Sequence, residues 1–246
     1  MSNKNDLKEY IEEKLQNDFN KLITVKDTDK SKIYIFEHKD SGKKILQRIS
    51  ANRNDDVFRE LVLIKNNNLV NILEVCSDEN NLIVLEDYID GTNLCEILKK
   101  GNLDRKAALK YTSDICDALI ILHKSGIIHR DIKPENVIIT NDDNAVLIDF
   151  SIARKISSDD GSDTANLGTV GYAAPEQYGI TQSNKTTDIY SLGVLLNIML
   201  TGEHPAVTTP KGAVKKIISK ATSTQISKRY QTAEQMKKDL VLFSHI

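Results

Sequence analysis

The chain has 246 residues, a length that suits one large domain or two small ones with a sizeable buried core. Its 40% hydrophobic and 28% charged residues are ordinary for a soluble globular protein, and a net charge of −2 argues against nucleic acid or an anionic membrane as a partner. The three cysteines, Cys76, Cys95 and Cys116, lack Cys-x-x-Cys spacing and cannot all pair, which favours reduced thiols and a cytoplasmic location.

The N-terminal stretch "MSNKNDLKEYIEEKLQNDFNKL" is charged throughout, so we expect neither a signal peptide nor a transit peptide. The longest apolar run, "SLGVLLNIMLTG", falls short of the ~18 to 20 residues that a membrane span needs. The sequence therefore predicts a protein that does not cross a membrane.

The first 88 residues predict one helix followed by a small β-rich lobe. Apolar residues at helical spacing indicate an amphipathic helix over 6–20 with one docking face, and these residues are Leu7, Tyr10, Ile11, Leu15 and Phe19. The lobe at 21–88 contains five strand-like stretches, "LITV", "KIYIFEHK", "KKILQRI", "NILEVC" and "NLIVLEDY". A helix, "NDDVFRELVLIKN", interrupts them, with an apolar face of Phe58, Leu61, Val62 and Ile64.

From residue 89 to residue 246 the pattern becomes mainly helical. A periodic stretch at 104–126 ends at Gly126, a typical C-terminal cap, and the stretch at 186–202 is apolar nearly all round, as in a buried helix. Two short strands, "NVIIT" and "AVLIDF", and helices around 213–221 and 232–243 complete the lobe. We therefore expect one α+β domain over 1–246, in which a small five-stranded antiparallel sheet plus helix is followed by a larger helical lobe.

Three short segments of the second lobe carry the chemistry. "HRDIKPEN" contains Asp131, Lys133 and Asn136, "DFS" follows a strand at Asp149, and "APE" ends at Glu176. In this order they resemble the eukaryotic-type (Hanks-type) serine/threonine protein kinases, and the small soluble bacterial forms most closely. The resemblance covers about residues 22–242 and implies a bilobal protein-kinase-like fold that transfers the γ-phosphoryl group of ATP to Ser/Thr hydroxyls of proteins.

The resemblance also implies the roles of these residues. Asp131 would accept or orient the proton of the attacking hydroxyl, and Lys133 would lie against the γ-phosphate as a point charge. Asn136 and Asp149 would supply oxygen ligands to Mg²⁺, with Mn²⁺ as an alternative metal.

Four further residues are expected to support this set. By the same resemblance, Thr169 should bond Asp131 and Lys133, Asp188 should cap the catalytic loop, and Glu176 should pair with the late Arg229. The segment before Glu176 is rich in hydroxyls, namely Ser157, Ser158, Ser162 and Thr164. We hypothesise that one of them is phosphorylated, by this protein or another, and then binds Arg130.

The nucleotide-binding part departs from the family pattern. The three glycine positions of the phosphate loop align with Lys26, Thr28 and Ser31, and none is glycine. The strand lysine is replaced either by Gln47, which the alignment favours, or by Arg48, which the electrostatics favour. Alternation along a strand sends these two side chains to opposite faces, so only one of them can serve.

The other nucleotide-binding residues are assigned by the same alignment. Glu60 matches the helix glutamate that pairs with the strand cation. Glu86 stands at the gatekeeper position, where its buried charge needs a partner such as Arg48 or Lys44 unless the alignment is shifted by one residue. Tyr88 and Ile89 lie in the linker "DYIDG" beside the expected nucleotide.

Two other functions compete with a protein kinase. A pseudokinase that only binds a nucleotide or a partner would explain the missing glycines and Gln47, and a small-molecule phosphotransferase would share Asp131 and Asn136. The complete reactive loop argues against the first, and the second is disfavoured because such enzymes lack the Gly-Thr and Ala-Pro-Glu segments. We therefore favour an active ATP-dependent kinase, whose substrate, activating signal and oligomeric state the sequence does not specify.

Overall fold

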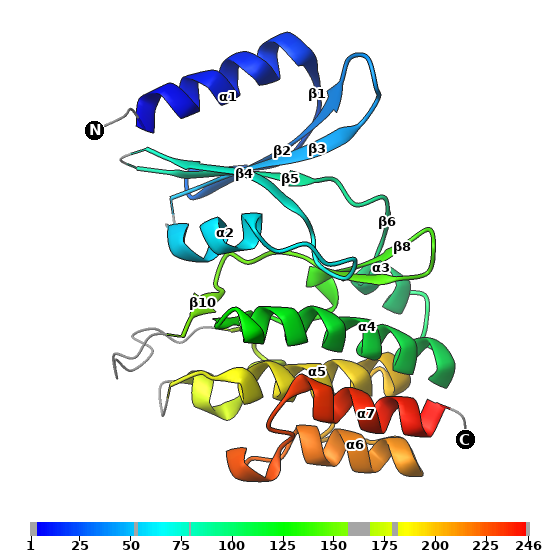
Figure 1. Cartoon of the computed structure of the whole chain (residues 1–246). Coiled ribbons are helices and arrows are strands. Elements are labelled where there is room, and N and C mark those ends of the chain that lie inside the picture. The colour runs from blue at the N-terminus through cyan, green and yellow to red at the C-terminus, as the bar shows by residue number, and fades with distance from the viewer. Residues whose placement is uncertain (1–3, 52–53, 79, 157–167, 179–181, 245–246) are drawn as a thin grey trace. The chain divides into compact units, whose positions relative to one another are not determined.

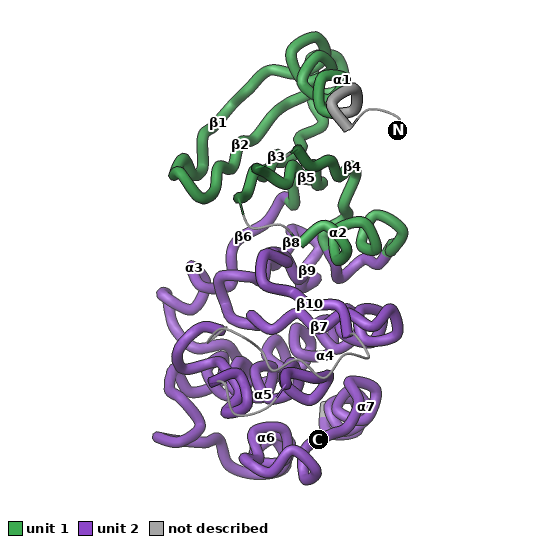
Figure 2. The backbone as a smooth tube through the Cα atoms, turned by 90° about the vertical axis from the view of Figure 1, so that its left-hand side faces the viewer, with its two compact units in different colours: residues 1–65, 70–89 green, residues 66–69, 90–246 purple. Residues whose placement is uncertain are grey.

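The computed structural model describes residues 4–51, 54–78, 80–156, 168–178 and 182–244, with side chains from residue 8 to residue 243. The chain folds into two compact units, shown in different colours in Figure 2. Unit 1 consists of Met1–Lys65 and Val70–Ile89, and unit 2 consists of Asn66–Leu69 and Asp90–Ile246. Each unit is described by itself below.

Unit 1 is built on a five-stranded antiparallel sheet with the strand order β1-β2-β3-β5-β4. The strands are β1 (Phe19–Thr28), β2 (Ser31–His38), β3 (Lys44–Ser50), β4 (Ile72–Ser77) and β5 (Leu82–Asp87). The α+β fold class and each of the five predicted strands are thereby confirmed. β-Branched or aromatic residues occur in each of these strands, as expected from their β propensity.

Helix α1 (Lys4–Asp18) covers one face of this sheet, and helix α2 (Asp55–Val62) covers the other (Figure 1). Ile11 and Leu15 of α1 are buried in one apolar cluster with Ile45, Cys76 and Ile83 of the sheet. The end of α1 is fastened by Lys39, whose Nζ donates to the carbonyl oxygens of residues 16 and 17 at 3.1 and 2.5 Å and whose amide donates to that of residue 18 at 2.8 Å.

The predicted boundaries and apolar face of α1 need correction. The helix ends at Asp18, because Phe19 already pairs with His38 in the sheet and packs edge-on against its ring at 4.9 Å. Tyr10 was expected on the docking face but is 52% exposed. It precedes the buried Ile11 by one residue, which turns its side chain about 100° around the helix and away from the sheet.

Helix α2 is shorter than predicted and has a different apolar face. Val57, Phe58 and Leu61 are buried, whereas Val62 is only half-buried and ends the helix. Ile64 was predicted on this face but lies beyond the helix end, where the chain has left the 3.6-residue repeat. The sequence analysis did not place Val57 on the apolar face of α2, because this residue follows two acidic residues.

Unit 2 is mainly helical. Its helices are α3 (Leu94–Leu98), α4 (Arg105–Lys124), α5 (Lys185–Thr201), α6 (Ala213–Ala221) and α7 (Ala233–Ser244). Its strands are β6 (Gly91–Asn93), β7 (Ile127–Ile128), β8 (Val137–Thr140), β9 (Ala145–Leu147) and β10 (Arg154–Lys155), in sheets ordered β6-β8-β9 and β10-β7. The predicted helices and the predicted β8 and β9 are present, while α3 and the two-residue strands were too short to show a period.

The ends of the long helices follow from their capping residues. The Asp104 carboxylate accepts the amide of Ala107 at 2.8 Å at the start of α4, and Gly126 follows its end with a φ of 71°. Asn184 begins α5 with a capping box and Gly202 ends it with a φ of 74°. Between these caps α5 is buried on nearly all sides, as its uniformly apolar sequence predicts.

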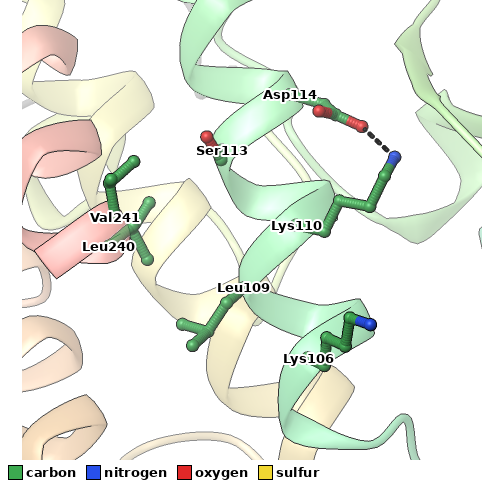
Figure 3. A pocket seen from close by; sticks show the side chains of 7 residues that line it. All are labelled: Lys106, Leu109, Lys110, Ser113, Asp114, Leu240 and Val241. Atoms are coloured by element: carbon green, nitrogen blue, oxygen red, sulfur yellow. Dashed lines mark hydrogen bonds and ion pairs between the residues drawn. The ribbon is translucent and has the colours of Figure 1, made fainter. Parts of the chain in front are cut away.

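Helices α4 and α7 of unit 2 pack side by side and leave a hollow of about 370 Å³ between them (Figure 3). Buried Leu109 and Leu240 line it, and Lys110 pairs with Asp114 at 3.1 Å on its wall. None of the residues proposed above for catalysis or nucleotide binding lines this hollow. It therefore plays no part in the candidate site.

No helix in the described part of the chain combines the length and the apolar character that crossing a membrane requires.

The contact of α1 with the sheet gives a direct test of the fold of unit 1. We expect Leu15→Ala to lower the free energy of unfolding by about 2–4 kcal/mol, because it leaves a cavity beneath the helix. Tyr10→Ala on the same helix removes an exposed side chain and should change it by less than about 0.5 kcal/mol. Urea unfolding followed by circular dichroism measures both, and equal effects of the two substitutions would contradict the observed orientation of α1.

Candidate active site

A buried carboxylate fixes the backbone that carries the catalytic loop. Asp188, at the start of α5, is fully buried and accepts the amides of His129 and Arg130 at 3.0 and 2.8 Å. Burial by itself would raise the pKa of Asp188, but the hydrogen bond from His123 at 2.8 Å and the charge of that ring hold the pKa below its usual value. The predicted capping role of Asp188 is confirmed.

His129 is a second positioning residue, which the sequence analysis missed. Its Nδ1 lies 3.3 Å from the amide of Asp131 and its Nε2 lies 3.1 Å from the carbonyl oxygen of Ile148. The first contact needs an acceptor nitrogen and the second a donor, so a neutral ring with its proton on Nε2 satisfies both. Burial lowers the pKa of His129, which favours this neutral form.

Three side chains meet around the carboxylate of Asp131. The Thr169 hydroxyl donates to Asp131 Oδ1 at 2.7 Å and accepts from Lys133 Nζ at 2.8 Å. Lys133 Nζ also lies 2.8 Å from Asp131 Oδ2, and Asn136 Nδ2 donates to the same oxygen at 2.9 Å. The predicted bonds of Thr169 are confirmed, and they connect residues that lie up to 38 positions apart in the chain.

The side chains of this cluster are mostly buried but remain partly accessible to solvent. The Asp131 side chain is 11% exposed and that of Lys133 is 20% exposed. A carboxylate held by an ammonium, a hydroxyl and an amide keeps a fixed orientation. Such a group can accept the proton of an incoming hydroxyl.

Asn136 and Asp149 provide the oxygen donors that a hard divalent cation requires. Both hydrogen bonds of Asn136 to Asp131 use Nδ2, which leaves the amide oxygen available to a metal. The backbone of Asp149 lies near Asn136, because the amide of the preceding residue, Ile148, donates to the carbonyl oxygen of Asn136 at 2.9 Å. Asp149 itself has a left-handed φ of 64°. The described residues contain no group of three or more His, Cys, Asp or Glu arranged as a metal site. Two donors suit a cation that takes its other ligands from phosphates and water.

A buried ion pair fixes the segment that follows Thr169. Arg229 donates to Glu176 through two parallel hydrogen bonds of 2.6 and 2.9 Å, and both side chains are at most 2% exposed. The Thr187 hydroxyl also donates to Glu176 at 2.9 Å. Burial by itself would raise the pKa of Glu176, but Arg229 and this hydroxyl hold it below 4.5. The predicted Glu176–Arg229 pair is confirmed.

Gln177 joins this segment to the catalytic loop, and the sequence analysis missed it. Its Nε2 donates to the carbonyl oxygen of Arg130 at 2.8 Å, and its Oε1 accepts the amide of Ala174 at 2.9 Å. The side chain is almost completely buried. Its position directly after the Ala-Pro-Glu triplet is the only signal that the sequence offers.

In unit 1 the structure separates the two candidates for the strand cation. Ile45 of β3 belongs to the apolar cluster beneath α1 and Ile49 packs against it, so Gln47 between them faces α1. Arg48 points to the other face, where its Nη2 lies 3.4 Å from Glu86 Oε1. The structure thus places Gln47 on the α1 side of β3 and Arg48 on the opposite side, because side chains alternate along a strand.

Glu86 is buried on β5, the strand next to β3, and its observed partner is Arg48 rather than Lys44. Lys44 Nζ lies over the ring of Tyr88 at 5.6 Å instead. Glu60 is half-buried on α2, and Tyr88 and Ile89 are half-buried after the end of β5. The residues predicted for nucleotide binding thus belong to unit 1, and those predicted for catalysis belong to unit 2.

A closed hairpin stands where the family has its glycine-rich loop. Thr28 of β1 pairs with Ser31 of β2, so only two residues connect the strands. The Thr28 hydroxyl accepts the amide of Ser31 at 3.2 Å and donates to its carbonyl oxygen at 2.9 Å. Lys26 is likewise paired with Ile33 in the ladder. The three positions aligned with the glycines are therefore part of a paired hairpin and not of an open loop.

The hydroxyls considered for phosphorylation, Ser157, Ser158, Ser162 and Thr164, lie outside the described residues. Arg130, their expected partner, has a left-handed φ of 66° and donates from Nε to the carbonyl oxygen of Ile152 at 2.7 Å. Phosphorylation of this segment stays a prediction.

Comparison with known proteins agrees with this geometry. Residues 18–244 match the protein kinase domain, and the chain belongs to this family. Members of the family use ATP and a divalent metal and act on proteins.

Among its relatives is a probable serine/threonine-protein kinase of Clostridium perfringens, 34% identical over 203 residues. The serine/threonine-protein kinases PrkC of Bacillus subtilis and PknB of Mycobacterium tuberculosis are 33% and 34% identical over 198 and 185 residues. The matches cover 72%, 70% and 64% of this chain but only 30%, 31% and 30% of these relatives. The chain thus spans less than a third of their length.

The Glu176–Arg229 pair leads to a prediction about stability and its pH dependence. Glu176→Gln leaves a buried guanidinium without its counterion and should lower the free energy of unfolding by about 3–5 kcal/mol at pH 7. The exposed Glu234, 3.8 Å from Lys124, is the matched control, and Glu234→Gln should cost less than about 1 kcal/mol.

Because folding lowers the pKa of Glu176, its contribution is complete above its ordinary value of 4.5 and is lost as the pH falls through the lower folded value. The difference between wild type and Glu176→Gln, measured by urea unfolding, should be constant from pH 7 to about pH 5 and shrink in stronger acid. A difference that grew on acidification would contradict the assignment.

Proposed function

We propose that this chain transfers the γ-phosphoryl group of ATP to serine and threonine hydroxyls of proteins, including its own. The observation that carries the proposal is the cluster in which Thr169, Lys133 and Asn136 all bond to Asp131. A pseudokinase has no need for a carboxylate held in this orientation with an ammonium beside it. The two units together form one protein kinase domain over 1–246, in which unit 2 supplies catalysis and unit 1 supplies nucleotide-binding groups.

The reaction needs positioning and charge neutralisation more than covalent chemistry from the protein. The oxygen of the acceptor hydroxyl forms a bond to the γ-phosphorus while the bond from that phosphorus to the β,γ-bridging oxygen breaks and ADP leaves. Asp131 orients the hydroxyl and takes its proton. Lys133, held in place by Thr169, offsets the negative charge on the transferred group.

Asn136 Oδ1 and the Asp149 carboxylate would hold Mg²⁺, or Mn²⁺ in its place. Bound there, the cation neutralises phosphate charge and draws its other ligands from the nucleotide and water. The Asp149 carboxylate also accepts the amide of Ser151 at 3.1 Å. Serine in place of the family glycine is thus compatible with this arrangement.

On the nucleotide side, we assign the role of the strand lysine to Arg48. It lies on the sheet face away from α1 and keeps a permanent positive charge, as contact with phosphate requires. Glu86 holds the guanidinium from the neighbouring strand, and Glu60 on α2 is the helix glutamate of the family pattern. Tyr88 and Ile89 would contact the adenine through the linker.

The choice of a protein as acceptor rests on the segment from Thr169 to Glu176, which the Glu176–Arg229 pair and Gln177 hold in place. Small-molecule phosphotransferases of similar fold lack this segment. The net charge of −2 gives no reason to expect nucleic acid or a membrane as partner, and the free thiols of Cys76, Cys95 and Cys116 fit a cytoplasmic location.

Phosphoryl transfer is tested with labelled ATP, Mg²⁺ and a generic protein substrate rich in serine and threonine. We expect the wild type to label the substrate and Asp131→Asn to lose activity by about 100-fold or more, because the base is gone while the shape is kept. ATP binding by both proteins without transfer by either would support the pseudokinase instead. Transfer to an aminoglycoside but not to protein would support the small-molecule enzyme.

The assignment of the strand cation is tested by a pair of neighbouring substitutions. Arg48→Met removes a charge from the phosphate side and should raise the KM for ATP about tenfold or more. Gln47→Leu changes the opposite face of the same strand and should leave this KM within about twofold of wild type. A large rise in KM for Gln47→Leu but not for Arg48→Met would instead assign the role of the strand lysine to Gln47.

A further inference from the structure

A second candidate site lies in unit 1, on the sheet face that α1 covers. Beside α1 there is a hollow of about 350 Å³. Its walls include Leu15 and Phe19 from the chain around the end of α1, and Phe36 and Ile49 from the sheet. A volume of this size admits a small organic molecule with one ring.

Gln47 gives this hollow its chemistry. The residue lines the hollow and is only 6% exposed. Among the described residues no side chain or backbone group forms a hydrogen bond with its side-chain amide. The amide atoms are not among the fully buried unpartnered ones, so they reach the hollow and can exchange water there for a polar group of a ligand.

The charges around the hollow favour a neutral ligand. Its charged lining residues are Glu12 and Lys21, one of each sign. Lys21 Nζ lies over the ring of Tyr34 at 3.5 Å, and Glu12 lies 4.0 Å from Lys8. Each charge thus has its own neighbour, and the remaining recognition comes from apolar walls, the buried amide of Gln47 and the exposed amide of Gln16.

We propose that this hollow binds a small neutral molecule that carries an apolar ring and a carboxamide or lactam group. The amide of Gln47 offers a donor and an acceptor side by side, and a carboxamide offers the complementary acceptor and donor. The aromatic rings of Phe19 and Phe36 provide apolar surface for the ring of the ligand. The hollow lies on the sheet face that α1 covers, whereas Arg48 and Glu86 lie on the opposite face, so the site is additional to the nucleotide and catalytic residues.

The experiment uses the full chain labelled with ¹⁵N, with benzamide as the probe. Benzamide should shift the signals of the Gln47 side-chain amide and of the backbone at Phe36 and Ile49, with a dissociation constant on the order of 1 mM. Acetophenone replaces the NH₂ group of benzamide with a methyl group at nearly the same size. It should bind about tenfold more weakly, because it cannot donate to Gln47.

Gln47→Leu supplies the matched protein variant. Removing an unpartnered amide should leave the melting temperature unchanged or raise it, while the affinity for benzamide falls about tenfold. A marked loss of stability would mean that the amide already has a structural partner and would overturn the proposal. So would equal binding of benzamide and acetophenone by the wild type, no binding of benzamide, or shifts centred on Leu73 and Leu85 in the hollow on the other side of α1.

Discussion

The fixed backbone around the buried carboxylate of Asp188 is the constraint on which the catalytic part depends. This one side chain accepts two consecutive amides and a ring nitrogen, and thereby stabilises a left-handed conformation at Arg130 that a β-carbon normally disfavours. The turn directs Asp131 toward Lys133 and Thr169. Without the carboxylate, two buried amides would be left unsatisfied and the loop would relax to a different backbone path.

In unit 2 the catalytic residues are therefore held in place by a network of hydrogen bonds from other residues. Asp188 holds the loop, His129 and Gln177 hold its two sides, and the loop holds the reacting groups. The residues that would touch substrates are only the last members of this network. The low exposure of Asp131 follows from this arrangement, because Thr169, Lys133 and Asn136 all contact its carboxylate.

The sequence alone predicted the elements that have a long, regular apolar period. It also predicted the catalytic residues that lie close together in the chain. Asp131, Lys133 and Asn136 are separated by only a few residues, so their types and order carry the information. The choice between Gln47 and Arg48 could not be made in this way, since both fit a strand and only the packing of α1 decides which face is covered. Tyr10 was mispredicted for the same reason: its apolar ring fits a buried helix face, yet the packing of α1 leaves it 52% exposed.

The attachment of α1 has a consequence for how unit 1 fluctuates. Lys39, just after β2, is bonded to three successive carbonyl groups at the end of the helix, where a positive charge also complements the helix dipole. The hydrogen bonds of Lys39 therefore join the end of α1 to the β2–β3 turn. Local opening of either would release the other, so the amides of both segments should exchange with solvent as one cooperative group.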